Sequence, residues 1–329
     1  SQRFMGVGRL YQNQDNNNTE QTSESQSQSQ SSPTQIIQTL ANSTVAIIGI
    51  GGVGTWAAEA IGRSGVGNII LLDLDDICTS NINRQLHALS STVGNMKIDT
   101  MKERLMDINP MCNVTLVHDF ITVDNIHSIM REQFKDADVI LDCIDGQTEK
   151  TALIASACLH NKTIVTCGGA AGRVDPTLIK CDDLSKSEQC RLLFRCKKTL
   201  RDEYKLFPKG PSDLKKKKKV RTRKWKIWAV YSEEEQKKPS TSKGGGVGAD
   251  DASSFSSSSL RRCDGALGTG CFVTGTYGFV AASKVISMLT NQEELIQPRI
   301  MNSARVAFAA SEKGSHVQAY QEGIHPSMF

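Results

Sequence analysis

One short stretch, residues 44–54, constrains the fold of this chain more than any other. Residues 45–48 are apolar and rich in β-branched side chains, which is typical of a buried strand. Four glycines follow the strand: Gly49, Gly51, Gly52 and Gly54. The next residues have helical composition, so a strand, a glycine turn and a helix N-terminus follow one another. This order directs backbone N–H groups and the positive end of the helix dipole at a bound phosphate, and it predicts a nucleotide site.

Apolar runs and helical segments alternate from this stretch to residue 167. Further strands are expected at residues 68–72, 113–118, 138–142 and 163–167, with helices between them. The predicted fold class is therefore α/β, a Rossmann-like and mostly parallel sheet with helices on both faces. Beyond residue 169 the alternation fades, and we expect a C-terminal extension of antiparallel strands and a helix. Residues 220–231 alternate in polarity and predict an edge strand.

The composition also predicts how the chain is divided. The expected parts are a docked N-terminal segment (1–11), a Gln-, Asn- and Ser-rich disordered stretch (12–32), a nucleotide-binding Rossmann-like domain (34–185), a mixed region (186–290) and a tail (291–329). The mixed region contains a basic helix, an insertion loop at 208–262 and a C-terminal core segment. Its most apolar part, residues 271–289, includes a lysine, glycines and threonines, so we interpret it as a buried helix and not as a membrane span.

Cysteine usage indicates the redox environment. Ten cysteines are scattered along the chain, and none forms a Cys-x-x-Cys pair. In a sequence with no secretory signal, this usage is typical of reduced cysteines in an intracellular protein. We also expect no bound zinc, because the chain lacks the Cys-x-x-Cys pairs that commonly hold structural zinc.

Charge is unevenly distributed along the chain. Residues 191–226 carry 16 Lys and Arg residues against three acidic ones, while the rest of the chain is net acidic. Such a basic block favours a polyanionic partner, and nucleic acid is the first candidate. Five of its cations are expected to form the binding patch on a helix: Arg191, Arg195, Lys197, Lys198 and Arg201. The run of lysines at 215–219 fits a binding surface and a solvated linker equally well.

The glycine turn alone does not identify the nucleotide. Gly49, Gly51 and Gly54 satisfy the G-x-G-x-x-G fingerprint of dinucleotide-binding enzymes. Asp73 stands where such an enzyme carries the acid that binds a ribose. An NAD-dependent or flavin oxidoreductase is therefore one alternative.

Residues beyond the second strand favour a triphosphate. Asn81, Arg84 and Lys97 supply hydrogen-bond donors and cations suited to phosphate groups. Asp145 follows the strand at 138–142, at the edge of a parallel sheet where ligands bind, and a single carboxylate there suits Mg²⁺. Together these residues fit cleavage of a phosphoanhydride bond better than hydride transfer.

Several motifs resemble those of the adenylating superfamily of ubiquitin-activating enzymes, the ThiF/MoeB type. They are Gly49-x-Gly51-Gly52-x-Gly54, Leu72-Asp73-x-Asp75, Asn81-x-x-Arg84-Gln85, Gly94-x-x-Lys97 and Asp142-Cys143-Ile144-Asp145. Within the superfamily, the chain is most similar to the tRNA threonylcarbamoyladenosine dehydratases. The closer signs are Arg9-Leu10-Tyr11, residues 84–89, Gly168-Gly169-Ala170 with Asp175-Pro176-Thr177, and residues 275–281.

The resemblance implies an ATP-dependent enzyme that activates the threonyl carboxylate of a modified adenosine in tRNA, after which the side chain closes into a cyclic form. It assigns the ATP ribose to Asp73, the phosphates to Asn81, Arg84 and Lys97, and Mg²⁺ to Asp145. It also implies a homodimer in which Arg9 reaches the ATP site of the other subunit. Some eukaryotic relatives associate with mitochondria, so an intracellular location, cytoplasmic or mitochondrial, is expected.

Some features depart from the family pattern, and one alternative stays open. Gly146 stands where relatives commonly carry Asn or Ser. Cys263 matches a cysteine of the dehydratases, which makes it a candidate substrate contact or a buried small hydrophobe. His87 is interpreted as a structural residue near the phosphates.

The alternative function is an adenylyltransferase that activates a ubiquitin-like or sulfur-carrier protein. The missing Cys-x-x-Cys pairs and the basic block are evidence against this alternative.

Overall fold

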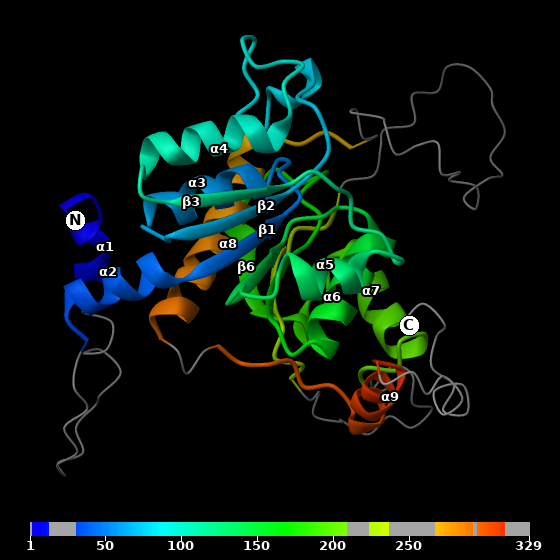
Figure 1. Ribbon diagram of the computed structural model, residues 1–329. Helices are drawn as coiled ribbons and strands as arrows, with labels where there is room; N and C mark the ends of the chain where they lie inside the picture. The colour runs from blue at the N-terminus through cyan, green and yellow to red at the C-terminus, as the bar shows by residue number, and fades with distance from the viewer. Residues whose placement is uncertain (1, 13–30, 209–223, 237–266, 292–294, 313–329) are drawn as a thin grey trace, which may run out of the picture.

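The computed structural model describes residues 2–12, 31–208, 224–236, 267–291 and 295–312. In this part of the chain, strands form one seven-stranded sheet in the order β3-β2-β1-β4-β5-β7-β6 (Figure 1). Their bounds are β1 Thr44–Ile48, β2 Asn68–Leu72, β3 Asn113–Val117, β4 Val139–Asp142, β5 Thr163–Cys167, β6 Ile179–Asp183 and β7 Trp228–Ser232. All neighbours from β3 to β7 are parallel, and β6 is antiparallel to β7. This is the predicted α/β sheet with an antiparallel extension.

Helices cover both faces of the sheet, because successive strand residues point to opposite sides. One face packs against α2 (Pro33–Asn42), α3 (Gly54–Arg63), α4 (Lys97–Ile108) and α8 (Cys271–Thr290), and the other against α5 (Ile126–Glu132), α6 (Gln147–Leu159), α7 (Arg191–Asp202) and α9 (Asn302–Glu312) (Figure 1). In β1, Val45 and Ile47 belong to the first layer, while Ala46 and Ile48 belong to the second. All four are buried, as expected for an inner strand of a parallel sheet.

The prediction of an edge strand within residues 220–231 is wrong. The strand that forms there, β7, lies between β5 and β6. Ala229 and Val230 belong to the opposite core layers, and both are fully buried. The edge is occupied by β6, which comes earlier in the sequence and pairs with β7 along its whole length. A short alternation of polarity therefore could not distinguish an inner strand from an edge strand here.

The long apolar helix α8 is part of the core. Among the described residues it is the one helix that is long and apolar enough to cross a membrane, but 61% of its most apolar window is buried inside the protein. Its Tyr277 hydroxyl accepts a hydrogen bond from the Ser232 N–H at 2.8 Å and donates one to the Gly169 carbonyl oxygen at 3.2 Å. These bonds tie α8 to the sheet, in agreement with the interpretation of residues 271–289 as a buried helix.

The N-terminal residues lie against the amino-terminal side of the sheet. Helix α1 (Met5–Gln12) packs on α2, which leads into β1. The Arg3 guanidinium donates a hydrogen bond to the Ile108 carbonyl oxygen at the end of α4, at 2.6 Å. Residues 13–30, 209–223, 237–266 and 313–329 lie outside the described residues, and with them the predicted disorder, most of the insertion loop and Cys263.

Candidate active site

The turn between β1 and α3 requires glycine at two positions. Gly49 has a φ of +85°, and a Cβ there would lie 3.1 Å from the carbonyl group of Cys143, which follows β4. A Cβ on Gly54 would overlap the carbonyl oxygen of Gly49. Helix α3 starts at Gly54, so its N-terminus opens onto the turn, as a phosphate site requires.

If the turn holds the predicted nucleotide, ATP, Gly54→Ala is expected to weaken its binding by about 5- to 150-fold, because an inserted methyl group that does not fit costs about 1–3 kcal/mol and must displace the turn. Isothermal titration with ATP measures this. Gly6→Ala is the control, since no atom lies within 4 Å of the place its Cβ would take. An unchanged affinity for ATP in Gly54→Ala would show that the turn is not the nucleotide site.

Asp73 follows β2, and its carboxylate is hydrogen-bonded to the backbone of the glycine turn. Its Oδ2 accepts a hydrogen bond from the Ile50 N–H at 2.6 Å, and its Oδ1 accepts one from the Asp75 N–H at 2.9 Å. Burial raises the pKa of Asp73, and nearby Lys97 opposes that shift. The carboxylate thus lies where the dinucleotide fingerprint places the ribose-binding acid.

Arg84 lies over the glycine turn. Its Cγ is 3.6 Å from the place that a Cβ on Gly52 would take. Its carbonyl oxygen accepts hydrogen bonds from the Trp56 indole at 3.1 Å and from the Thr274 hydroxyl at 3.2 Å. Helices α3 and α8 therefore fix the backbone of Arg84. Trp56 and Thr274 could not be predicted as supports of Arg84, because neither belongs to a recognisable motif.

Asn81 shapes the segment that carries Arg84. It is buried, and its Oδ1 accepts a hydrogen bond from the Cys78 N–H at 3.1 Å. This bond closes the short 3₁₀ helix Thr79–Asn81. The Arg84 guanidinium donates back to the Ser80 carbonyl oxygen at 2.6 Å. Asn81 thus places Arg84 in this structure.

Lys97 is the first residue of α4 and is buried. Its Nζ lies 2.6 Å from Oδ2 of Asp75, whose side chain is half exposed. Close by, the His87 ring places Nε2 3.1 Å from the Ile50 carbonyl oxygen. Burial lowers the pKa of His87 to about 4, so this ring is neutral at physiological pH and supports the turn rather than carrying charge.

Asp145 lies in the loop between β4 and α6, and its side chain is exposed. Its carboxylate has no hydrogen bond or ion pair with the residues that the structure describes. The loop is held by Asp142, whose Oδ1 accepts a hydrogen bond from the Ile144 N–H at 3.1 Å. Because Cys143 packs against Gly49, this loop borders the glycine turn directly.

The structure thus gathers most of the predicted residues at one edge of the sheet. Asp73 is hydrogen-bonded to the glycine turn, the Arg84 side chain lies beside Gly52, and Lys97 is close enough to Asp73 to affect its pKa. Asp145 borders the turn from the other side. All follow the carboxyl ends of β1, β2 and β4, where open parallel sheets bind ligands.

Arg9 is not part of this cluster. It is exposed on α1, which packs on α2 at the amino-terminal side of the sheet. The ligand edge is at the carboxyl-terminal side. Arg9 therefore does not reach the glycine turn of its own chain.

The predicted basic patch is smaller than the sequence suggested. Lys197 is buried, and its Nζ donates a hydrogen bond to the Ser187 carbonyl oxygen. Arg201 is half buried, with its guanidinium carbon 4.9 Å from the centre of the Trp225 ring. Including these two in an exposed patch was wrong, because α7 turns them toward the core. Three of the five predicted cations remain exposed: Arg191, Arg195 and Lys198.

The buried Lys197 predicts a pH-dependent stability. Burial lowers its pKa to about 8, so between about pH 8 and 10 the unfolded chain binds more protons than the folded one. The free energy of unfolding of the wild type, relative to Lys197→Met, should therefore rise across this range. Urea unfolding at several pH values measures it. The exposed neighbour, changed as Lys198→Met, is the control for loss of a lysine from α7. A difference between wild type and Lys197→Met that does not change with pH would contradict the prediction.

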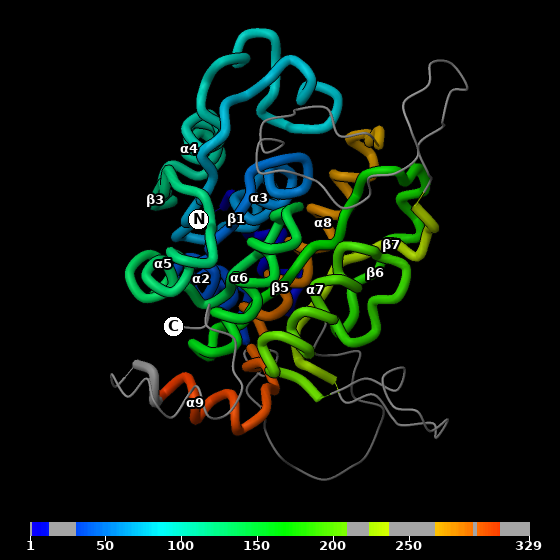
Figure 2. The backbone as a smooth tube through the Cα atoms, turned by 90° about the vertical axis from the view of Figure 1, so that its right-hand side faces the viewer, coloured from blue at the N-terminus to red at the C-terminus, as the bar shows by residue number. Residues whose placement is uncertain are grey.

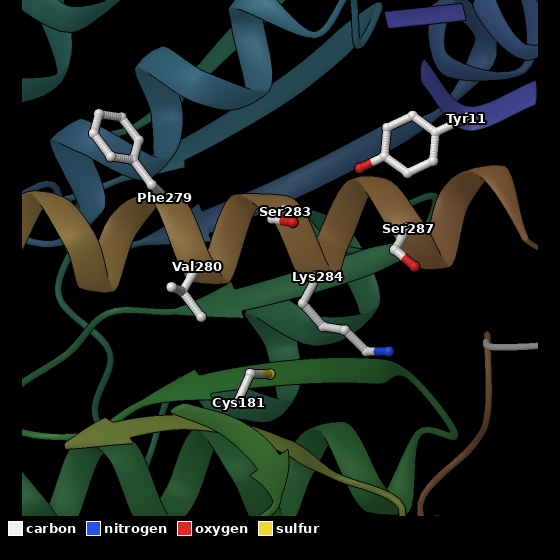
Figure 3. Close-up of a pocket in the computed structure, with 7 residues that line it drawn as sticks. All are labelled: Tyr11, Cys181, Phe279, Val280, Ser283, Lys284 and Ser287. Atoms are coloured by element: carbon white, nitrogen blue, oxygen red, sulfur yellow. The ribbon is translucent and has the colours of Figure 1, made fainter. Parts of the chain in front are cut away.

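A separate pocket of about 430 Å³ lies along α8 and is lined by Tyr11, Cys181, Phe279, Val280, Ser283, Lys284 and Ser287 (Figure 3). Lys284 points across it, with Nζ 3.6 Å from the centre of the Trp228 ring. None of the residues predicted to bind the nucleotide lines this pocket. It is therefore distinct from the glycine turn.

Known proteins share both the sequence and the fold. The sequence matches the model of the ThiF family over residues 24–315. It is 36% identical over 293 residues to the tRNA threonylcarbamoyladenosine dehydratase of Haemophilus influenzae, which covers 89% of this chain and 95% of that protein. The enzyme of the same name from Escherichia coli is 35% identical over 291 residues, which covers 88% of this chain and 93% of that protein.

Solved structures extend the similarity to ligand-bound forms. The chain is similar to Escherichia coli tRNA N6-threonylcarbamoyladenosine dehydratase, TcdA, in complex with ATP, with a TM-score of 0.68 and 32% sequence identity. The match covers 89% of this chain and 95% of that chain. The same relative in complex with AMP also matches with a TM-score of 0.68.

Proposed function

This chain belongs to the ThiF family, and on that basis we propose that it is an ATP-dependent tRNA threonylcarbamoyladenosine dehydratase. The observation that carries the proposal is the glycine turn, enclosed by Asp73, Arg84 and the loop of Asp145. It occurs in a chain that matches dehydratases of this name over 89% and 88% of its length. The substrate is a modified adenosine of tRNA, and the reaction removes one water from it.

The chemistry requires that a carboxylate oxygen become a leaving group. In the proposed reaction, an oxygen of the threonyl carboxylate attacks a phosphorus of ATP, displaces pyrophosphate or ADP, and forms a mixed anhydride with AMP or phosphate, respectively. An internal nucleophile of the modification then attacks the carboxyl carbon. The oxygen departs with AMP or phosphate, and the nucleophile loses a proton, so one water is lost from the adenosine overall.

Arg84 and Lys97 are the cations that we assign to this step. Negative charge develops on the phosphoryl oxygens as the carboxylate attacks, and preorganised cations stabilise it. The backbone of Arg84 is fixed by two hydrogen bonds, which limits the reorganisation that binding requires. The Lys97 ammonium has three donors, so it can keep its bond to Asp75 and still contact a phosphate.

Mg²⁺ fits this site as a companion of ATP, with Asp145 as its protein ligand. No group of three or more His, Cys, Asp or Glu residues in the described part of the chain could hold a metal by itself. Mg²⁺ typically uses one or two carboxylates together with phosphate oxygens and water, so a single exposed aspartate beside the turn suffices. The ion would neutralise phosphate charge and polarise the phosphorus that is attacked.

The proposed function is tested by mass analysis of nucleosides after incubation of the protein with ATP and tRNA that carries threonylcarbamoyladenosine. The expected product is lighter than the substrate by one water, and it forms only when ATP is present. Release of pyrophosphate from ATP with a ubiquitin-like protein, but not with tRNA, would instead favour the adenylyltransferase alternative.

We also propose a homodimer in which Arg9 completes the site of the other subunit. The position of Arg9 at the opposite side of its own sheet supports this arrangement. Arg9→Ala and Asp145→Ala should each be inactive alone. Mixed and re-associated, they should recover about a quarter of the wild-type activity, because half of the dimers then contain one intact site. No recovery, with mixed dimers verified by mass spectrometry, would place Arg9 outside the site.

A further inference from the structure

The outward face of α7 combines three cations with an exposed aromatic ring. Arg191, Phe194, Arg195 and Lys198 follow the i, i+3, i+4, i+7 spacing, which places them on one side of a helix. All four are exposed, and Phe194 is 59% exposed. The opposite side of α7 is buried through Leu193, Cys196 and Leu200. Phe194 is therefore not needed to attach the helix to the core.

The charged ends on this face are available to a partner. Among the described residues, none accepts a hydrogen bond or forms an ion pair with the side chains of Arg191, Arg195 or Lys198. The two other cations of α7 already have partners within the protein, since Lys197 is hydrogen-bonded to Ser187 and the Arg201 guanidinium lies over the Trp225 ring. The exposed face is thus positive and carries one flat apolar ring at its centre.

The helix that carries this face begins beside the candidate active site. The N-terminal end of α7 lies at the carboxyl end of β5, where the Cβ position of Gly168 is 2.7 Å from Sγ of Cys190. One turn and a half later, Sγ of Cys196 lies 3.8 Å from the carbonyl oxygen of Gln147, two residues beyond Asp145. Figure 2 shows α7 beside α6, whose N-terminus carries the Asp145 loop. A polyanion bound along α7 would therefore reach the edge that holds the glycine turn.

We propose that Phe194 stacks on an unpaired base of the substrate tRNA, while Arg191, Arg195 and Lys198 contact the phosphates on either side of it. The inference rests on the proposed function and adds a named recognition element to it. Proteins read RNA mainly at single-stranded loops, where bases stack on aromatic side chains, and cations fix the backbone without reading sequence. An adenosine that must enter an active site is also unpaired at that moment, so a loop is the part of the tRNA that fits beside this site.

The test compares Phe194→Ala, Phe194→Leu and Phe194→Tyr in binding to tRNA that carries threonylcarbamoyladenosine. Phe194→Ala is expected to raise the Kd and the KM for tRNA by about 5- to 100-fold, the range typical of one lost base stack. Phe194→Tyr should retain the affinity, and Phe194→Leu should lose it, because leucine is apolar but has no ring. The KM for ATP and the kcat at saturating tRNA should stay unchanged in all three variants.

The salt dependence of tRNA binding distinguishes the contribution of the Phe194 ring from that of the cations. Phe194→Ala should leave the slope of log Kd against log salt unchanged, whereas Arg195→Gln should reduce it by about 0.7 to 0.9. A fully paired RNA duplex is the second probe, and Phe194→Ala should not weaken its binding. Phe120→Ala is the matched control, since Phe120 is 50% exposed and follows β3 at the other edge of the sheet.

Two results would overturn the inference. One is an unchanged affinity of Phe194→Ala for the modified tRNA, which would leave the ring to a different partner such as an acidic protein. The other is full retention of affinity by Phe194→Leu, which would exclude stacking. Failure of the wild type to remove water from tRNA would instead reject the proposed function. The affinities of the Phe194 variants for tRNA would still show whether Phe194 stacks on a base, because they are measured without catalysis.

Discussion

Replacement of Arg84 by methionine should lower kcat/KM for ATP-dependent dehydration by about 100- to 1000-fold, the cost typical of removing one preorganised donor from a developing negative charge. Arg84 lies over the glycine turn, next to Gly52. Its carbonyl oxygen is fixed by Trp56 and Thr274, so methionine should occupy the same place without the charge. The loss should fall mainly on kcat, because the charge on the phosphoryl oxygens is largest in the transition state.

Single-turnover kinetics with saturating ATP measures this effect apart from product release. Arg63→Met is the control, because Arg63 is at the far end of α3, is exposed and pairs only with Glu59 among the described residues. Its activity should stay within about two-fold of the wild type. If Arg84→Met kept wild-type turnover, the assignment of Arg84 to the phosphates would be wrong.

Lys150→Met should lower the free energy of unfolding by about 3–5 kcal/mol, which is the typical cost of leaving one member of a buried ion pair alone. Both Lys150 and Asp142 are fully buried, and the Lys150 Nζ lies 2.7 Å from Oδ2 of Asp142. Thr166 also donates a hydrogen bond to this oxygen at 2.6 Å. Burial lowers the pKa of Lys150, but the attraction of Asp142 and the hydrogen bond to it outweigh this effect and leave the pKa raised.

Urea unfolding measures the loss, and a double variant isolates its cause. In Asp142→Asn with Lys150→Met, no charge is buried, and the asparagine Oδ1 can still accept the Ile144 N–H. The double variant should regain most of the stability that Lys150→Met loses. If Lys150→Met alone cost less than about 1 kcal/mol, the pair would be hydrated rather than buried.

Most of the sheet could be predicted because each strand is a short apolar run that ends at a polar residue or a glycine. The predicted range 68–72 equals the bounds of β2, and 138–142 differs from β4 by one residue. The order of the last two strands could not be predicted in this way. Pairing between residues 179–183 and 228–232 depends on contacts across a long insertion, which local polarity does not encode.

In the candidate site too, local sequence motifs could be recognised, but contacts between residues far apart in the sequence could not be predicted. The glycines, Arg84 and Lys97 carry a recognisable spacing, and the sequence identified them. Trp56 and Thr274 fix Arg84 from 28 and 190 residues away, and only the folded chain brings them together.

Neighbouring residues of the same type can also differ in burial, which composition does not reveal. Lys197 and Lys198 are adjacent in the sequence, yet the first is buried and bonded to Ser187 while the second is exposed. Helix α7 rotates successive side chains by about 100°, so one side of it meets the core and the next residue points to water. The burial of Lys150 had no sequence signal, since the polar residues Glu149 and Thr151 flank it.

The central claim is that ATP, bound over the glycine turn, takes an oxygen from the substrate carboxylate. Its most direct test uses tRNA in which the threonyl carboxylate is labelled with ¹⁸O, followed by mass analysis of every product. The account predicts one ¹⁸O in the released AMP or phosphate and a cyclised nucleoside that has lost one labelled oxygen. Dehydration without label in AMP or phosphate would show that the carboxylate is never activated by ATP and would contradict the account.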